Sequence, residues 1–553
     1  MTKLSRRSRV VASVAAPVAV LATLVPASGA AAAGKHPADS FAGARPPVGP
    51  PVGPPKPAAE APDLTPGQAS PWKPLKHAPP FDPGTMLLAS DGTVLVHAEP
   101  PAGGTSEWYK LTPDSRGSYA GGTWSRIASM PGGYDPLYFA SAILPDGRMI
   151  VEGGEYLGGT PTWTSKGAIY NPVTNTWRKV APPGGWSNIG DAQGDVLANG
   201  TFMLSQACQN CLTSSPILST NDALFNATGR NWLTLGGQGK NDPNDEEGWT
   251  LEPSGQLLTV DTWLTPSTEL FTPASLSWAS AGNTVRSPVN SPTAEIGPQV
   301  EMPGGNTLVV GGGSGAAAPK ACTTHTPAAT ALYDYAAGRW VNGPSIPTIG
   351  GLQYDSADGP GSVLPDGNVL FDVSPCVYNA PIAFFLYRAT SRTLVPVPDV
   401  PNAARDSSYN TRMLALPNGQ VLFNDGSHHM EVYTAGGTAS PAWAPSITSI
   451  SSGSFRPGQT GSLSGTQLAG LDPGATYGDD VQSNTNFPVV RITNARTGVV
   501  TYARTSRWSS VSIAPGAASS TNFTVPGTTP AGASTLVVVA NGIASQPVRV
   551  TIR

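Results

Sequence analysis

The amino-acid sequence predicts an all-β protein in which a seven-bladed β-propeller is followed by an immunoglobulin-like β-sandwich. Only 12% of the 553 residues are charged, whereas Gly (63) and Pro (57) are abundant. This composition suits short strands joined by turns better than long helices. A strand–turn–strand unit recurs seven times within residues 70–440. Residues 444–553 then show period-two alternation between turns, which is typical of a sandwich.

Each repeat contains an apolar strand, a turn of the Pro-Asp-Gly type and a second apolar strand, as in "AILPDGRMIVEGG" and "LALPNGQVLFNDG". A glycine in each turn permits the positive φ of a tight hairpin. These glycines are Gly92, Gly147, Gly200, Gly255, Gly305, Gly367 and Gly419. A second hairpin that carries Tyr or Phe and then Trp follows most turns, as in "AIYNPVTNTWRKV". Two hairpins make a four-stranded sheet, and seven such sheets around an axis make a propeller.

The seventh repeat stops after "MEVYTAGG" and lacks its tryptophan strand. The stretch "SPWKPLKHAPP", which contains Trp72, matches that missing strand. We therefore expect Trp72 to complete the last sheet, so that the beginning of the repeat region closes the ring and removes a free edge. An array of sandwiches is the competing architecture, but it would not reproduce both hairpins in every repeat.

The N-terminal 33 residues have the features of a cleaved signal peptide. A basic segment ending at Arg9 precedes an apolar run from Val10 to Pro26 and a small-residue cleavage region. A membrane anchor is the alternative, but the apolar run is short and Pro17 interrupts it. Residues 34–69 are a Pro-rich linker that is expected to be extended. We expect a secreted protein, not inserted in a membrane after cleavage.

Net charge limits the kinds of partner. Without the four basic residues of the signal peptide, 28 basic and 36 acidic residues remain, a formal charge of −8. An acidic secreted chain without a basic run argues against nucleic acid and anionic membranes as partners. We expect a monomer.

Four cysteines are expected to form disulfides after export. Cys208 and Cys211 can close a small loop within "CQNC", which leaves Cys322 to pair with Cys376. A zinc site is the alternative, but a second CxxC and clustered histidines are missing from the sequence.

The repeats, the Gly-Gly pairs in "VEGGEY" and "VVGGGSG", and the C-terminal domain resemble the galactose oxidase / glyoxal oxidase family. The resemblance covers residues 70–553 and implies a kelch-type propeller followed by an early-set domain. Members of that family are copper radical oxidases. Their copper is held by two tyrosines and two histidines, and one tyrosine is joined by a thioether to a cysteine.

Carried over to this sequence, the copper set is mostly replaced. Tyr409 matches the axial tyrosine, whereas Asn410 stands where a copper histidine follows it. Asp191 takes the place of the radical tyrosine, and Tyr138 that of its cysteine. The stretch that matches the loop of the last histidine has Ser506, Arg507 and Trp508 instead. Because Asn is a poor ligand for Cu(II) beside imidazole, copper is not expected as a cofactor.

Equivalent offsets in the repeats predict an acidic mouth at one end of the ring. The residues nine positions before the turn glycines are Pro83, Tyr138, Asp191, Glu246, Ile296, Asp358 and Asn410. In a propeller these positions should lie together around the axis, so Asp191, Glu246 and Asp358 should converge. Glu295 and Asp355 stand close to the same positions in sequence.

Three uses of such a mouth compete: a solvated rim, a sugar site, and a site for a hard cation such as Ca²⁺. Acids and amides accept hydrogen bonds from hydroxyls, and Trp249 could stack on a sugar face. We expect the protein to bind an extracellular or cell-surface carbohydrate. The candidate ligand-binding residues are Tyr138, Asp191, Glu246, Glu247, Trp249, Asp358, Tyr409 and Asn410. The enzyme alternatives are an oxidase with a rebuilt metal site and a glycan hydrolase that uses the mouth carboxylates.

Overall fold

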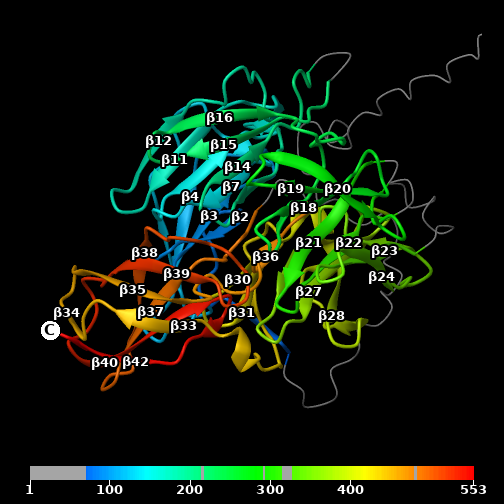
Figure 1. Ribbon diagram of the computed structural model, residues 1–553. Helices are drawn as coiled ribbons and strands as arrows, with labels where there is room; N and C mark the ends of the chain where they lie inside the picture. Colours follow the sequence, from blue (N-terminus) through cyan, green and yellow to red (C-terminus); the bar gives the residue numbers. More distant parts are fainter. Residues whose placement is uncertain (1–69, 213–216, 291–292, 314–326, 479–481) are drawn as a thin grey trace, which may run out of the picture. The chain divides into compact units, whose positions relative to one another are not determined.

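The computed structural model describes residues 70–212, 217–290, 293–313, 327–478 and 482–553 (Figure 1). The predicted signal peptide and Pro-rich linker lie outside the described residues. Within them the chain is built from strands and three short 3-10 helices, η2 (Ala403–Arg405), η3 (Ser408–Asn410) and η4 (Pro441–Trp443), without an α-helix. No described helix has the length and apolar character that a membrane crossing needs. The prediction of an all-β protein is confirmed.

Each of the seven repeats forms an antiparallel sheet of four strands, which we call a repeat sheet; the sixth also pairs with two short strands (Figure 1). The first three are β2 (Pro83–Leu88), β3 (Val94–Ala98), β4 (Trp108–Thr112), β5 (Thr123–Arg126); β7 (Ala140–Ile143), β8 (Met149–Glu152), β11 (Gly167–Asn171), β12 (Thr176–Val180); and β13 (Gly194–Val196), β14 (Phe202–Ser205), β15 (Asp222–Asn226), β16 (Asn231–Gly236).

The fourth and fifth are β17 (Thr250–Leu251), β18 (Leu257–Val260), β19 (Ser267–Thr272), β20 (Ser277–Asn283); and β21 (Ile296–Met302), β22 (Asn306–Gly311), β23 (Ala329–Asp334), β24 (Arg339–Ser345). The sixth and seventh are β26 (Gly361–Val363), β27 (Val369–Pro375), β28 (Ala383–Arg388), β29 (Thr393–Val397); and β30 (Arg412–Ala415), β31 (Gln420–Asn424), β32 (Met430–Thr434), β1 (Trp72–Pro74). Beside them, β6 (Pro136–Leu137), β9 (Tyr156–Leu157) and β10 (Thr160–Pro161) pair with one another, and β25 (Tyr354–Asp355) pairs with β27.

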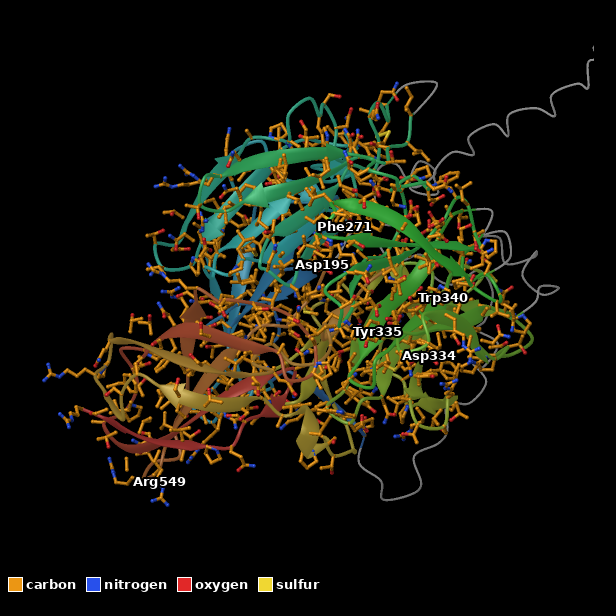
Figure 2. The ribbon with its side chains drawn as sticks, viewed as in Figure 1. Asp195, Phe271, Asp334, Tyr335, Trp340 and Arg549 are labelled. Atoms are coloured by element: carbon orange, nitrogen blue, oxygen red, sulfur yellow. A yellow bond between two sulfur atoms is a disulfide. The ribbon has the colours of Figure 1, made fainter. Side chains whose placement is uncertain are left out.

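The two hairpins of a repeat are stabilised in different ways. All seven turn glycines of the inner hairpins have positive φ, from 72° at Gly92 to 84° at Gly200, as predicted. In the outer hairpins the aromatic residue and the tryptophan are cross-strand partners, as with Tyr333 and Trp340, whose ring centroids lie 5.2 Å apart. The tryptophan also connects its sheet to the preceding one. Trp340, which is labelled in Figure 2, donates a hydrogen bond from Nε1 to Thr268 Oγ1 at 2.8 Å.

The strand of Trp72 completes the seventh repeat sheet, as predicted. Trp72 pairs with Tyr433 in an antiparallel register. Its ring contacts Phe384, Phe423 and Tyr433 edge-to-face, at centroid distances of 4.9, 5.5 and 5.0 Å. Its indole N–H donates to Pro398 O at 2.6 Å. The first described strand is thus held by the last repeats of the region.

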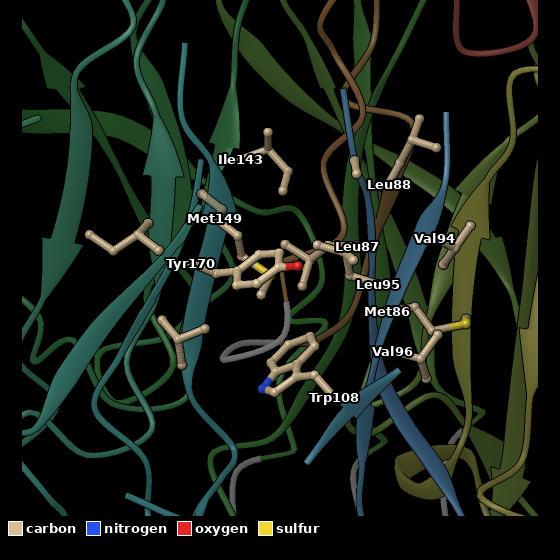
Figure 3. Close-up of a cluster of buried hydrophobic side chains, with 14 of the residues drawn as sticks. Met86, Leu87, Leu88, Val94, Leu95, Val96, Trp108, Ile143, Met149 and Tyr170 are labelled. Carbon is tan, nitrogen blue, oxygen red and sulfur yellow. The ribbon is translucent and has the colours of Figure 1, made fainter. Parts of the chain in front are cut away.

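The repeat sheets contact one another in a closed order. The innermost strands meet as β2 with β7, β7 with β13, β17 with β21, β21 with β26, β26 with β30, and β30 again with β2. The third and fourth sheets are joined by Trp278, whose indole N–H donates to Asp222 Oδ2 at 2.7 Å. Between the first two sheets the core includes Leu95, Trp108, Met149 and Tyr170 (Figure 3). Burying each such side chain stabilises the fold by about 1.5–3 kcal/mol.

Residues 446–552 form a sheet with its own core. Its strands are β33 (Ser446–Ile450), β34 (Ser454–Phe455), β35 (Thr460–Thr466), β37 (Val489–Asn494), β38 (Val500–Ser506), β39 (Ala518–Thr524), β40 (Gly532–Ala540), β41 (Ile543–Ala544) and β42 (Val548–Ile552). Phe455, Val490 and Phe523 belong to its hydrophobic core. One strand of this region, β36 (Ala475–Thr476), leaves the sheet and pairs with β26 of the sixth repeat sheet.

Candidate functional site

Three carboxylates from three successive repeats lie together, and we call them the carboxylate cluster: Glu246, Glu295 and Asp358. Each offers a carboxylate oxygen, and these oxygens all lie within 4.8 Å of one another. Glu246 and Glu295 are buried, whereas Asp358 is half-buried. Each residue precedes the innermost strand of its sheet, β17, β21 or β26. Glu246 and Asp358 are thus neighbours, as their equivalent offsets predict.

The backbone conformation explains why residues at the same position in different repeats lie close together. Tyr138, Glu246 and Asp358 occupy equivalent positions in their repeats, and their φ angles are +52°, +62° and +48°. For a side chain other than glycine, this left-handed conformation costs roughly 1–2 kcal/mol. Three repeats therefore share a strained bend immediately before the innermost strand, and strain of this kind is concentrated at ligand sites.

Two tyrosines border the carboxylate cluster. Tyr378 and Tyr409 meet edge-to-face, with ring centroids 5.4 Å apart. Burial raises the pKa of the Tyr378 phenol well above its ordinary value, and the charges of the three cluster carboxylates raise it further. The phenol remains protonated and donates a hydrogen bond to Glu295. Tyr378 is therefore a neutral hydrogen-bond donor facing the carboxylates.

The segment around β36 brings residues of the C-terminal region to the same place. Tyr477 Oη donates to Tyr409 O at 2.8 Å, and the Arg412 guanidinium lies 4.2 Å from the centre of the Tyr477 ring. Gly478 follows, and a Cβ there would come 3.0 Å from Asp358 Cα and 2.8 Å from Ile296 O. Only a glycine fits this close approach to the cluster.

The C-terminal loop that the resemblance implies does not lie where it was expected. The resemblance places Ser506, Arg507 and Trp508 where the last copper ligand would stand. The backbone N–H of Trp508 instead donates to Pro145 O, beside the turn of the second repeat, and its ring stacks on Phe487 at 4.6 Å. Residues 475–478, which carry no repeat signal, approach the carboxylate cluster instead.

Asp191 belongs to a different group. It lies beside Tyr156, whose pKa is raised by burial first and then by the nearby charges of Glu155 and Asp191. The Tyr156 ring meets that of Tyr138 at 6.1 Å. Asp191 is not part of the carboxylate cluster among the described residues, so two of the three predicted acids converge.

Glu247 and Trp249 make their contacts outside the carboxylate cluster. Glu247 is fully buried, and its Oε1 accepts a hydrogen bond from Lys240 Nζ at 2.7 Å. Trp249 is only 5% exposed and packs against Trp278 at a centroid distance of 5.6 Å. The expected stacking of Trp249 on a sugar is therefore corrected: its ring is part of the hydrophobic core.

Asn410 ends the 3-10 helix η3, where its N–H donates to Ser407 O at 3.0 Å. Tyr409, which precedes it, is half-buried. The sequence pair that resembles the copper ligands is thus part of the turn that leads into β30.

One predicted disulfide is confirmed. Cys208 and Cys211 are bonded to each other, and no described cysteine is a free thiol. Cys322 of the second predicted pair, Cys322 with Cys376, lies outside the described residues, so this pairing stays a prediction.

The site offers oxygen ligands to a metal ion. Two groups of three acids among the described residues could each hold a cation, and neither contains a histidine or a cysteine. His428 and His429 are exposed, and His428 Nε2 lies 3.2 Å from Asp82 Oδ1. Carboxylate oxygens suit Ca²⁺, whereas Cu(II) favours imidazole nitrogen, which neither group offers.

Sequence comparisons give no assignment: the chain matches no family model and no curated protein. Solved structures similar to it include a fungal alcohol oxidase of the AA5 family in complex with copper, which is 13% identical. The match covers 88% of this chain and 99% of that one, with a TM-score of 0.48. YjhT is 17% identical over 59% of this chain and 99% of its own, with a TM-score of 0.39.

The extracellular domain of the putative hybrid two-component system BT4673 from B. thetaiotaomicron is also similar. It is 9% identical, and the match covers 88% of this chain and 59% of that one, with a TM-score of 0.43.

Proposed function

We propose that the protein binds an extracellular carbohydrate at the carboxylate cluster, through a Ca²⁺ ion held by Glu246, Glu295 and Asp358. A calcium ion coordinated by three carboxylates keeps coordination positions for further oxygens, because Ca²⁺ takes six to eight ligands. Neighbouring hydroxyl groups of a sugar can fill those positions. Tyr378 adds a neutral donor on the border of the site.

The observation that carries this proposal is the mutual approach of three carboxylate oxygens to within 4.8 Å. Like charges at this separation repel one another unless a cation or protons compensate them. Ligand oxygens lie about 2.3–2.6 Å from Ca²⁺, so two of them on opposite sides of the ion are about 5 Å apart. The observed limit therefore suits oxygens that share one calcium ion.

The donor set separates this proposal from copper-radical chemistry. The groups that gather at the cluster are carboxylates and phenols, which are hard oxygen ligands. We therefore propose a galactose oxidase-like architecture whose mouth binds carbohydrate. We do not propose copper-radical oxidation at this site.

The wider architecture is part of the proposal. We infer that the seven repeat sheets are blades of one kelch-type β-propeller, supported by the closed order of their contacts. We infer that residues 446–552 are an immunoglobulin-like early-set domain, supported by their separate core. The protein is proposed to be a secreted monomer without nucleic acid or membrane partners, which agrees with its acidic composition.

A glycan array tests the function. The purified protein is applied with Ca²⁺ and with a chelator, alongside the variants Glu246→Gln and Asp358→Asn. We expect binding that requires Ca²⁺ and that falls about tenfold or more in both variants, since each loses a charged contact. The matched control is Glu107→Gln, which removes a half-exposed acid paired with Arg126. Binding that survives both cluster substitutions would reject this site.

A further inference from the structure

A second group of acids is built around a buried lysine, and we call it the Lys240 cluster: Lys240, Asp242, Glu247, Asp261 and Glu269. Asp242, Glu247 and Asp261 each offer a carboxylate oxygen, and these oxygens lie within 4.8 Å of one another. All three side chains are fully buried. Asp242 and Glu247 come from the loop before β17, and Asp261 directly follows β18.

The hydrogen bonds of the Lys240 cluster leave one carboxylate unsatisfied. Lys240 Nζ donates to Glu247 Oε1 and to Glu269 Oε2, both at 2.7 Å. Asp242 Oδ2 accepts from the backbone N–H groups of Thr262 and Trp263 at 3.0 and 3.2 Å.

Asp261 differs from its neighbours, because neither of its carboxylate oxygens has a hydrogen-bond partner. A carboxylate that is fully buried and unpartnered is strongly unfavourable, unless a cation or a proton compensates it. Asp261 thus points to a ligand, independently of the number of acids around it.

Charge leads to the same conclusion. The cluster holds four acidic side chains, Asp242, Glu247, Asp261 and Glu269, and the single ammonium group of Lys240. Lys240 bonds to two of the acids, so Asp242 and Asp261 form no ion pair with it and need a proton or a further cation. Buried ions in proteins are paired or coordinate metals.

We propose that Asp242, Glu247 and Asp261 bind a buried Ca²⁺ ion, which is distinct from the ion of the carboxylate cluster. The spacing of their oxygens fits one coordination shell of calcium by the same geometry as above. Magnesium demands shorter bonds and retains several waters, which a fully buried site of three carboxylates disfavours. The ion neutralises Asp261 and fixes the loop between Lys240 and Glu247.

The buried ion also affects the mouth. Glu247 ligates the buried ion, and its neighbour Glu246 belongs to the carboxylate cluster and has a strained φ of +62°. Fixing Glu247 therefore holds Glu246 in its bend. This consequence rests on the proposed function, whereas the buried site itself does not.

Metal analysis of the full-length protein tests the proposal. The protein is equilibrated with Ca²⁺, freed from unbound ion, and its calcium content is measured by mass spectrometry. The variants are Asp261→Asn for the buried site and Asp358→Asn for the mouth, with Glu301→Gln as the matched control for removing a buried acid. We expect Asp261→Asn and Asp358→Asn each to lose one ion, and Glu301→Gln to lose none.

The outcomes separate the two claims. An unchanged calcium content in Asp261→Asn overturns the buried site, even if Asp358→Asn loses its ion. An unchanged content in Asp358→Asn overturns the mouth ion alone. A wild-type protein without bound calcium overturns both.

A second measurement covers the case in which Asp261→Asn fails to fold. Tb³⁺ replaces Ca²⁺ at oxygen sites, and nearby tryptophan sensitises its emission. The centre of the Trp278 ring lies 5.1 Å from Lys240 Nζ, so an ion in the Lys240 cluster has a tryptophan close by. We expect Asp358→Asn, which removes the mouth ion, to keep emission that is sensitised by tryptophan. Loss of all sensitised emission in Asp358→Asn would contradict the buried site.

Discussion

Glu246 and Glu247 are consecutive residues, yet the first belongs to the carboxylate cluster and the second to the Lys240 cluster. One short loop therefore supplies a carboxylate to each of the two groups. The positive φ of Glu246 marks the bend at which the chain turns from one group to the other. This arrangement connects a buried electrostatic network to the site that we propose for carbohydrate binding.

Closure by Trp72 predicts a large loss of stability in Trp72→Ala. The substitution removes three edge-to-face ring contacts and the hydrogen bond to Pro398 O. We expect the free energy of unfolding to fall by about 3–5 kcal/mol in chemical denaturation. Trp124→Ala, which removes a more exposed indole bonded to His77 O, is the control and should cost less. Equal losses would show that the closing strand has no special role.

The close approach of Gly478 predicts that Gly478→Ala weakens ligand binding. A Cβ at this position would come 3.0 Å from Asp358 Cα and 2.8 Å from Ile296 O, and neither backbone atom can rotate away. We expect Asp358 to be displaced and the affinity for the glycan or for Ca²⁺ to fall by about tenfold. The affinity is measured by isothermal titration calorimetry.

Gly453→Ala is the matched control, because a Cβ there has no neighbour within 4 Å. A wild-type affinity in Gly478→Ala would mean that the segment after β36 does not shape the site.

Asp261 predicts a pH dependence of stability in the absence of metal. Burial raises the pKa of this carboxyl from its ordinary 3.8 to about 8, against the attraction of Lys240. Because the pKa is raised in the folded state, the protonated carboxyl is tolerated at low pH, and stability is lost as the pH rises from 3.8 to about 8. In chelator, the wild type should therefore lose stability over this range more steeply than Asp261→Asn. The difference in slope is at most about 1.4 kcal/mol per pH unit.

Denaturation curves measured at several pH values with chelator give these slopes. Added Ca²⁺ should remove the difference, since the ion stabilises the ionised carboxylate. Parallel slopes in chelator would contradict the assignment of Asp261 as an uncompensated buried group.

The repeat pattern predicts the strands and the closure because both depend on local signals. Each turn glycine marks a hairpin, and Trp72 carries the aromatic signal of the missing strand. The same offsets predict that Glu246 and Asp358 lie together. Asp191 does not join the carboxylate cluster, because in its repeat the residue with positive φ is Gly190 rather than Asp191.

The remaining site residues depend on contacts that no periodicity reveals. Glu295 stands one residue before its offset position, so the repeat register alone does not select it. Tyr477 and Gly478 reach the cluster from a region that lies far beyond Asp358 in sequence. Trp249 is buried because it packs on Trp278, which lies in the last strand of the same repeat sheet. The sequence around Trp249 does not reveal this contact.

The most direct test is anomalous X-ray diffraction from a crystal of the protein grown with Ca²⁺. We expect an anomalous-difference peak among the carboxylate oxygens of Glu246, Glu295 and Asp358, about 2.3–2.6 Å from each. We expect the peak to be lost in Asp358→Asn. Absence of a peak among these residues in the wild type, with calcium present in excess, would contradict calcium binding at the carboxylate cluster.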